Sequence, residues 1–285
     1  MINKLLIIGG DIRQLYMSYY LESLGYEIYL YGLPETNRKC ESKIKEAIKK
    51  TDAIIFPLPI TKDGKHVFSI TPVKETLDEI INLIDADKIV FAGMIDRGTK
   101  TKLSNKKIKY YDYFEREDVT VMNTVPTVQG ILKVIIDNID YTIHSSKCAV
   151  FGYGRVAKVT AEALKSLGAD VTICARKNGD LASARINGMK SCYISDFTDD
   201  ADKYNFIVNT VPSQIIDRNI LSSLKSECMI IDVASSPYGT DFAAANELGI
   251  KAMQCPSLPG KVAPKTAGKI IADGILNIIK EENYG

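Results

Sequence analysis

The sequence predicts an α/β protein of two Rossmann-like, doubly wound parallel-sheet domains with a cleft between them. Short apolar runs rich in β-branched residues alternate with helical patterns along the chain, and this alternation is typical of parallel sheets covered by helices on both faces. The strand-like runs, such as LLII and AIIF, are continuously apolar, as expected for strands buried on both faces. A length of 285 residues also favours two domains, because one domain usually takes about 150 residues.

Both halves of the chain show the same rhythm of strands and helices. In the first half we expect strands at Leu5–Ile8, Glu27–Tyr31, Ala53–Phe56 and Lys88–Phe91, with helices at Ile12–Leu24, Ser42–Lys49 and Pro72–Ile84. In the second half we expect strands at Cys148–Phe151, Asp170–Cys174, Phe206–Val208 and Met229–Asp232, with helices that include Val156–Leu167 and Leu181–Gly188. Each half should therefore form its own α/β unit.

Two further helical patterns set the expected domain boundaries. Thr124–Ile139 leaves the first domain, and Lys265–Lys280 has no strand after it, so we expect it to pack back on the first domain. The first domain is thus predicted to comprise residues 1–122 and 265–285, the linking helix residues 123–145, and the second domain residues 146–264. A helix pair that bridges two α/β domains leaves a cleft, where ligands commonly bind.

The composition disfavours several classes of function. Lys and Arg number 36 and Asp and Glu 35, so the net charge is +1, which argues against a nucleic-acid groove or a membrane surface. None of the six cysteines forms a C-x-x-C pair, so we expect reduced core cysteines and no metal site. The N-terminal apolar run is too short for a signal peptide, and no stretch approaches the roughly 20 apolar residues of a membrane span. We therefore expect a soluble, cytoplasmic protein.

A dinucleotide site is predicted at CAVFGYGRVA, residues 148–157. This segment gives G-x-G-x-x-A after a strand and before a helix, the context that makes the motif specific. Gly152 would permit the tight turn, Gly154 the approach of the backbone to the pyrophosphate, and Ala157 close helix–strand packing. The predicted cofactor residues in the turn are Gly152, Tyr153, Gly154, Arg155 and Val156. A glycine-rich turn without a ligand is the alternative.

The second strand of this unit ends at Arg176 and Lys177, and these cations indicate which dinucleotide binds. NAD enzymes usually place Asp or Glu here for the ribose 2′-hydroxyl, whereas an arginine suits the 2′-phosphate of NADP. Because a guanidinium offers phosphate a bidentate fork, we predict NADP, with NAD as the alternative cofactor. Two solvated cations at a loop are the competing interpretation.

Two turns after later strands complete the predicted cofactor site. They are Asn209, Thr210, Val211 and Pro212 after one strand, and Asp232, Val233 and Ala234 after the next. Both lie at carboxyl ends of strands, where open α/β sheets bind ligands. An ordinary Pro-terminated loop is equally compatible with the first turn.

The first domain is predicted to bind something other than a dinucleotide. Its Gly9-Gly10-Asp11 turn resembles the fingerprint, but Asp11 stands where the second glycine would be, and a carboxylate there would repel a pyrophosphate. Asp11 is a natural cap for the following helix. Arg13 is poorly placed for the helix dipole, so we interpret it as a ligand of an anionic substrate, although a solvated surface arginine is equally compatible.

The motifs together resemble the A-subunit family of dipicolinate synthase, from spore-forming bacteria. Four segments carry the resemblance: GGDIRQ at 9–14, NTVPT at 123–127 with Gly130, the fingerprint from Gly152 to Arg176, and LPGKVAPKTAG at 258–268. The first and last are fairly specific to this family, whereas the fingerprint is generic.

The resemblance implies NADP- or NAD-dependent oxidation of a dihydrodipicolinate-level lysine-pathway intermediate to dipicolinate (pyridine-2,6-dicarboxylate) in the mother-cell cytoplasm during sporulation. It also implies a flavoprotein-like B-subunit as a partner, and a homo-oligomer is compatible with it. The small dicarboxylate substrate needs cations, and we expect it between the domains. The predicted substrate residues are Asp11, Arg13, Asn123, Thr127, Lys261, Lys265 and Thr266.

The catalytic residues are not apparent, which leaves two other functions open. His66 and His144 are the only histidines, and no Tyr-x-x-x-Lys occurs, so a dedicated general base is not evident. The Asn209–Pro212 turn and Arg176 would suit a shikimate-dehydrogenase-like NADP oxidoreductase. Such an enzyme would also need a catalytic Lys–Asp pair in the first domain, where no clear motif for one occurs. A non-catalytic NADP-binding scaffold protein is the other alternative.

Overall fold

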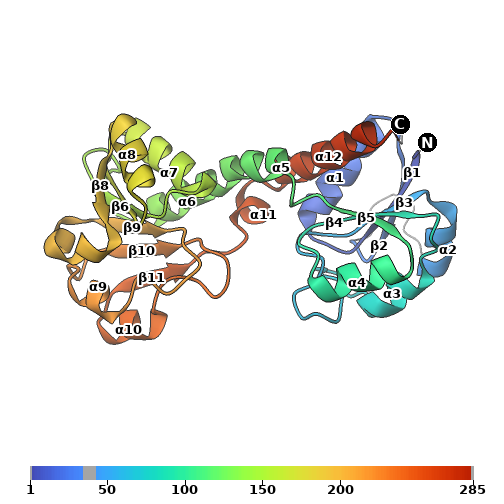
Figure 1. Cartoon of the computed structure of the whole chain (residues 1–285), viewed down its shortest axis with the longest axis horizontal. Helices are drawn as coiled ribbons and strands as arrows, with labels where there is room; N and C mark the ends of the chain where they lie inside the picture. Colours follow the sequence, from blue (N-terminus) through green and yellow to red (C-terminus); the bar gives the residue numbers. More distant parts are fainter. Residues whose placement is uncertain (1, 35–42, 284–285) are drawn as a thin grey trace. The chain divides into compact units, whose positions relative to one another are not determined.

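The computed structural model describes residues 2–34 and 43–283. Residue contacts divide the chain into two compact units, Met1–Asn123 with Ala263–Gly285 and Thr124–Val262. Each unit contains a parallel β-sheet flanked by helices (Figure 1), so the predicted α/β class is confirmed. Cys40 and Ser42 lie outside the described residues.

The first unit has a parallel sheet in the order β2-β1-β3-β4-β5, which is the order of flavodoxin-like doubly wound folds. Its strands are β1 (Lys4–Ile8), β2 (Glu27–Tyr31), β3 (Ala53–Ile55), β4 (Ile89–Ala92) and β5 (Lys109–Asp112). Its helices are α1 (Ile12–Ser23), α2 (Ile44–Lys50), α3 (Leu77–Leu83), α4 (Arg97–Asn105), α5 (Glu117–Met122) and α12 (Pro264–Glu281).

Strand β1 explains why the strands are continuously apolar. Leu5 and Ile7 pack in one core with side chains of α1 and α12, whereas Leu6 and Ile8 pack in another with α2, α3 and α4. Successive side chains of a strand point to opposite faces of the sheet, so both faces of β1 are buried. Helix α12 lies close along α1, as the contact at Gly268 shows: a Cβ at this position would overlap the Arg13 carbonyl. The C-terminal helix thus packs on the first unit, as expected.

The second unit has the strand order β11-β10-β9-β6-β7-β8, the order of dinucleotide-binding Rossmann domains. Its strands are β6 (Lys147–Phe151), β7 (Asp170–Ala175), β8 (Lys190–Tyr193), β9 (Phe206–Asn209), β10 (Met229–Asp232) and β11 (Lys251–Gln254). Its helices are α6 (Thr124–Asn138), α7 (Arg155–Ser166), α8 (Asn178–Ile186), α9 (Arg218–Ser222), α10 (Phe242–Glu247), α11 (Leu258–Val262) and the 3-10 segment η1 (Ile194–Lys203). The order reverses between β6 and β9, where such sheets bind their ligands.

Segment 123–145 differs from the linking helix expected from the sequence. Helix α6 contributes Ile131 and Ile135 to the core of the second unit. The helical stretch Glu117–Asn138 is also long and apolar enough to cross a membrane, contrary to the expectation that no such stretch exists. However, Val119, Ile131 and Ile135 are almost fully buried in the protein. We therefore interpret the stretch as core helix.

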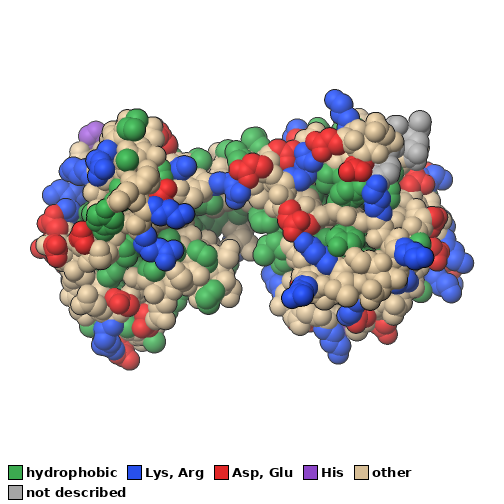
Figure 2. Space-filling view, viewed as in Figure 1, with side chains coloured by type: hydrophobic (Ala, Val, Ile, Leu, Met, Phe, Trp, Pro, Cys, Tyr) green, Lys and Arg blue, Asp and Glu red, His purple; other side chains and the backbone are tan. Residues whose placement is uncertain are grey.

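Three buried thiols in or next to strands agree with the interpretation as core cysteines. Cys148, Cys174 and Cys228 are free and fully buried. Burial raises the pKa of the Cys148 and Cys228 thiols to about 12, which keeps them protonated and unreactive. On the face shown in Figure 2, basic and acidic side chains are interspersed, in keeping with a net charge of +1.

Candidate functional site

The turn between β6 and α7 contains two glycines in different backbone settings. Gly152 has a φ of +97°, a backbone region that favours glycine, and an added Cβ would lie 2.7 Å from Thr210 Oγ1. Gly154 has a φ of −78°, and an added Cβ would meet nothing within 4 Å. The fold therefore requires glycine at 152 but not at 154. Glycine at 154 fits a ligand that approaches the backbone closely.

Helix α7 begins without a cap from the protein. Its N-cap residue is Gly154, which offers no side-chain hydrogen bond, and its described first turn contains no acidic residue. The first N–H groups of a helix and its dipole favour an anion at this end. Ala157 is fully buried in the core beneath the helix, which permits the close packing expected from the motif. These features fit the pyrophosphate of a dinucleotide.

A cavity of about 280 Å³ lies at the carboxyl ends of β6, β7 and β9, at the reversal of the strand order. It is lined by Gly152, Tyr153, Gly154, Ala175, Arg176, Lys177, Asp180, Ile194, Thr210, Val211 and Pro212. The structure thus brings most of the predicted cofactor residues to one cavity. Arg155 and Val156 follow in the first turn of α7 without lining it.

The cavity carries two cations and one carboxylate where β7 passes into α8. Arg176 and Lys177 line it directly after the strand, as the NADP prediction requires. Asp180, in the first turn of α8, also lines it and is not marked by the sequence pattern. The cations would attract a ribose 2′-phosphate, whereas the carboxylate would repel one and accept hydrogen bonds from ribose hydroxyls.

Asn209 shapes the turn after β9 from inside the protein. Its side chain is fully buried. Its Nδ2 donates to the Val211 carbonyl at 3.2 Å, and its Oδ1 accepts from the Val211 N–H at 3.1 Å. The Thr210 hydroxyl donates to the Phe151 carbonyl at 2.8 Å, which ties this turn to the end of β6. Asn209 therefore presents Thr210, Val211 and Pro212 to the cavity rather than reaching it itself.

Asp232 has the same kind of role after β10. Its carboxylate is fully buried and accepts from the Ala234 N–H at 3.0 Å, the Gly239 N–H at 3.0 Å and the Thr240 hydroxyl at 2.8 Å. Asp232, Val233 and Ala234 do not line the cavity that the structure describes. The aspartate organises the loop at residues 234–240, and any effect of it on a ligand would act through that loop.

In the first unit, Arg13 is buried and paired. The Arg13 side chain is only 8% exposed, so the alternative of a solvated surface arginine is wrong. Its Nε donates to Asp11 Oδ1 at 2.9 Å, and its Nη2 donates to Asp11 Oδ2 at 2.9 Å and to the Leu58 carbonyl at 2.6 Å. Asp11 also caps α1, as expected, and the Gln14 side chain accepts from the Asp11 N–H. This arginine therefore fixes the turn after β1.

The first unit also contains a histidine–carboxylate pair that the sequence patterns did not reveal. His66 Nδ1 lies 2.7 Å from Asp63 Oδ2 on an exposed loop. Hydrogen bonds from His66 and Lys65 hold the pKa of Asp63 well below its usual range. The segment that follows reaches the carboxyl end of β1, because the Gly10 N–H donates to the Phe68 carbonyl at 2.7 Å. The loop at 63–68 is thus tied to the turn that holds Asp11.

Comparisons with known proteins match both halves of the chain. Residues 4–114 match the family model of the N-terminal domain of the dipicolinate synthase A-subunit. Residues 123–276 match the S-adenosyl-L-homocysteine hydrolase NAD binding domain. The chain is 33% identical to the dipicolinate synthase A-subunit of Bacillus subtilis over 98% of its own length and 96% of that protein.

The chain belongs to the dipicolinate synthase A-subunit family. The crystal structure of the corresponding protein from Bacillus halodurans agrees, with a TM-score of 0.88, 33% identity and coverage of 97% of each chain. A transhydrogenase from Sinorhizobium meliloti has a TM-score of 0.68 over 98% of this chain and 92% of its own, at 13% identity. At that identity the likeness concerns the fold alone, a two-domain dehydrogenase-like architecture.

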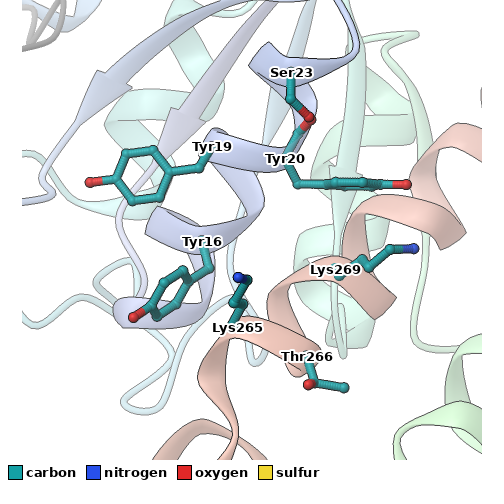
Figure 3. Close-up of a pocket in the computed structure, with 7 residues that line it drawn as sticks. All are labelled: Tyr16, Tyr19, Tyr20, Ser23, Lys265, Thr266 and Lys269. Carbon is teal, nitrogen blue, oxygen red and sulfur yellow. The ribbon is translucent and has the colours of Figure 1, made fainter.

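The predicted substrate residues of this family member are divided between the two units. Asp11, Arg13, Asn123, Lys265 and Thr266 belong to the first unit, and Thr127 and Lys261 to the second. Asn123 ends α5, with its N–H donating to the Val119 carbonyl at 2.9 Å. Lys265 and Thr266 lie at the start of α12 and line a pocket with tyrosines of α1 (Figure 3). The Arg13 guanidinium does not line that pocket.

Proposed function

We propose that the chain is the dehydrogenase component of a dipicolinate synthase. It oxidises a dihydrodipicolinate-level intermediate of the lysine pathway to dipicolinate, with NADP as the preferred hydride acceptor. The proposal is carried by family membership over nearly the whole chain together with the cavity at the β6–α7 turn. The match of the first unit to the family's own N-terminal domain favours this reaction over that of a shikimate-dehydrogenase-like enzyme.

The residues of the chain bind and orient the reactants. When bound, the nicotinamide supplies the hydride acceptor. The start of α7 receives the pyrophosphate, Gly154 lets the backbone approach it, and Arg176 with Lys177 holds the 2′-phosphate. Loss of a hydride and a proton makes the substrate ring aromatic, so positioning contributes more than a strong base. Asn123, Thr127 and Lys261 remain candidates for binding the substrate carboxylates.

The choice of NADP predicts a selective effect of Arg176→Ala. Charge-assisted contacts to phosphate contribute about 1.5–3 kcal/mol, so NADP should bind roughly ten- to hundredfold more weakly, while NAD binding stays nearly unchanged. Isothermal titration calorimetry with both dinucleotides measures this. Arg185→Ala removes the same charge from α8 outside the cavity lining and should alter neither affinity. Equal losses for NADP and NAD in Arg176→Ala would place the 2′-phosphate elsewhere, and Asp180 would then favour NAD.

The B. subtilis relative is one component of a synthase with more than one kind of chain, which supports a partner protein. We propose that this partner is a flavoprotein-like B-subunit and that the two act in the mother-cell cytoplasm during sporulation.

The reaction is tested with the purified chain, NADP and enzymatically generated dihydrodipicolinate, with and without the B-subunit. We expect dipicolinate and NADPH to form in equal amounts. Formation without the partner would exclude the alternative of a non-catalytic scaffold. If neither the chain alone nor the complex forms dipicolinate, the proposed reaction is wrong.

A further inference from the structure

A second cavity lies between α1 and α12 in the first unit. Its volume is about 460 Å³, and it is lined by Tyr16, Tyr19, Tyr20, Ser23, Lys265, Thr266 and Lys269 (Figure 3). This volume lies within the range of about 300–1,000 Å³ that is usual for small-molecule sites. The dinucleotide cavity is built from residues of the second unit, so the two cavities share no residue.

Three tyrosines contribute aromatic rings to the wall of this cavity. Tyr16 and Tyr19 are arranged edge to face, with ring centroids 6.2 Å apart. In Figure 3 these two rings lie on one side, Tyr20 lies on the other, and the Lys265 amine is directed between them. Tyrosine rings offer broad faces and edges to another flat ring, which they contact best in offset-stacked or edge-to-face geometry.

The charged groups of the cavity are cationic. Lys265 forms no ion pair or hydrogen bond with any residue that the structure describes. Lys269 donates to Asp273 at 2.6 Å and lies 4.6 Å from the Tyr20 ring centroid, so its charge is partly neutralised. No acidic side chain is among the described lining residues. Lys265 therefore provides the available positive charge.

The start of α12 adds to this positive potential. Lys265 and Thr266 stand in the first turn of an 18-residue helix whose N-cap, Ala263, provides no side-chain hydrogen bond. The dipole of a long helix favours an anion at this end. The helix start alone would not define a site, but here it opens on a tyrosine-walled cavity that also holds Lys265.

We propose that this pocket binds a planar aromatic carboxylate, with its ring against the tyrosines and a carboxylate at Lys265 and the start of α12. An uncharged apolar ligand would leave Lys265 unused, and a simple anion such as phosphate would leave the tyrosine faces unused. The pocket lies open at the surface, since Tyr19, Ser23, Lys265, Thr266 and Lys269 are exposed. Its volume of about 460 Å³ nevertheless fits a small molecule better than a protein partner. The inference goes beyond the proposed reaction and rests on it only for the choice of probe, since dipicolinate belongs to this chemical class.

The test is calorimetric titration of the full chain with dipicolinate in the absence of NADP. Isophthalate serves as a second aromatic dicarboxylate that chelates metals poorly. We expect both to bind, and Lys265→Met to weaken each about tenfold, the effect of losing one charge-assisted contact. Tyr19→Ala should weaken both as well. Lys280→Met, on the same helix outside the pocket, should bind like the unmodified protein.

Several results would overturn the inference. One is that Lys265→Met and Tyr19→Ala bind dipicolinate and isophthalate as tightly as the unmodified protein does. Another is that phosphate or a cyclohexane dicarboxylate binds as tightly as the aromatic dicarboxylates. Loss of B-subunit binding in Tyr19→Ala, with dipicolinate binding intact, would make the face a protein docking surface instead. NADP titration and turnover of the same samples separate the two proposals. A chain that turns over but does not bind the probes at Lys265 refutes this inference alone, and one that binds them without turnover refutes only the proposed reaction.

Discussion

Replacing Gly154 with valine is expected to abolish dinucleotide binding while the protein stays folded. The backbone at Gly154 has an ordinary φ of −78°, and an added Cβ meets no protein atom within 4 Å. The branched side chain would instead occupy the space into which the pyrophosphate approaches the turn. Calorimetry should detect no NADP or NAD binding at concentrations that saturate the unmodified protein, with an unchanged circular dichroism spectrum.

Gly152→Ala is the matched comparison for this prediction. Gly152 has a φ of +97° and would bring a Cβ to 2.7 Å from Thr210 Oγ1, so alanine there is strained in the protein itself. We expect Gly152→Ala to lower the melting temperature more than Gly154→Val, which loses only a glycine N-cap of α7. If Gly154→Val still binds NADP, the pyrophosphate does not lie at this turn. If it melts as early as Gly152→Ala, the glycine has a structural role beyond that of a helix N-cap.

The parts of the fold that the sequence predicted are those buried on both sides. β1 and β10 are apolar except for Lys4 and Asp232, because both faces of each strand are covered, and their bounds were predicted to within one residue. Strands β5, β8 and β11 were missed. Each lies at or near a sheet edge, and their sequences KYYD, KSCY and KAMQ are only partly buried, so they lack the apolar run.

Some helices were predicted less well than the buried strands. The helix expected at Pro72–Ile84 begins at Leu77, because Thr76 and Glu79 form a capping box. The short helices α4, α5, α9, α10 and α11 were not predicted from the sequence. Helices of this length depend on tertiary packing rather than on a strong periodic pattern.

The dinucleotide cavity was predictable because its residues follow strands in a fixed local order. Gly152, Gly154 and Arg176 all come from one βαβ unit, so their positions follow from the motif. Asp180 and Ile194 reach the same cavity without any motif that marks them. The roles of Asn209 and Asp232 were also hidden, since the sequence places them at strand ends but does not show that their side chains turn inward.

Arg13 shows most clearly what sequence patterns omit. An arginine in the first turn of a helix opposes the helix dipole, and this conflict led to the prediction of an anionic substrate ligand. The structure provides a different partner, since Asp11 two residues earlier accepts both arms of the guanidinium. The Leu58 carbonyl, 45 residues away in the sequence, also accepts a hydrogen bond from the guanidinium, and no local pattern predicts that contact.

Arg13→Ala is therefore expected to destabilise the first unit strongly. Removing one partner of a buried ion pair costs about 3–5 kcal/mol, and we expect about 3 kcal/mol because the Asp11 side chain is 19% exposed. The corresponding fall in melting temperature is roughly 10 °C for a unit of this size, while NADP affinity is unchanged. Arg97→Ala, at the exposed start of α4, should shift the melting temperature by little.

A double-mutant cycle separates this structural role from substrate binding. If the pair stabilises the turn, Asp11→Ala and Arg13→Ala should each destabilise the protein, and the double variant should lose less than the sum of the two. Arg13→Met, which keeps most of the side-chain volume, should behave like Arg13→Ala, because the lost interaction is the charge pair rather than the packing. A substrate ligand would behave differently. Neither substitution would then change the melting temperature much, and the effects of the two positions on stability would be additive. KM for the dicarboxylate would rise when Arg13 is replaced by methionine and Asp11 is left in place.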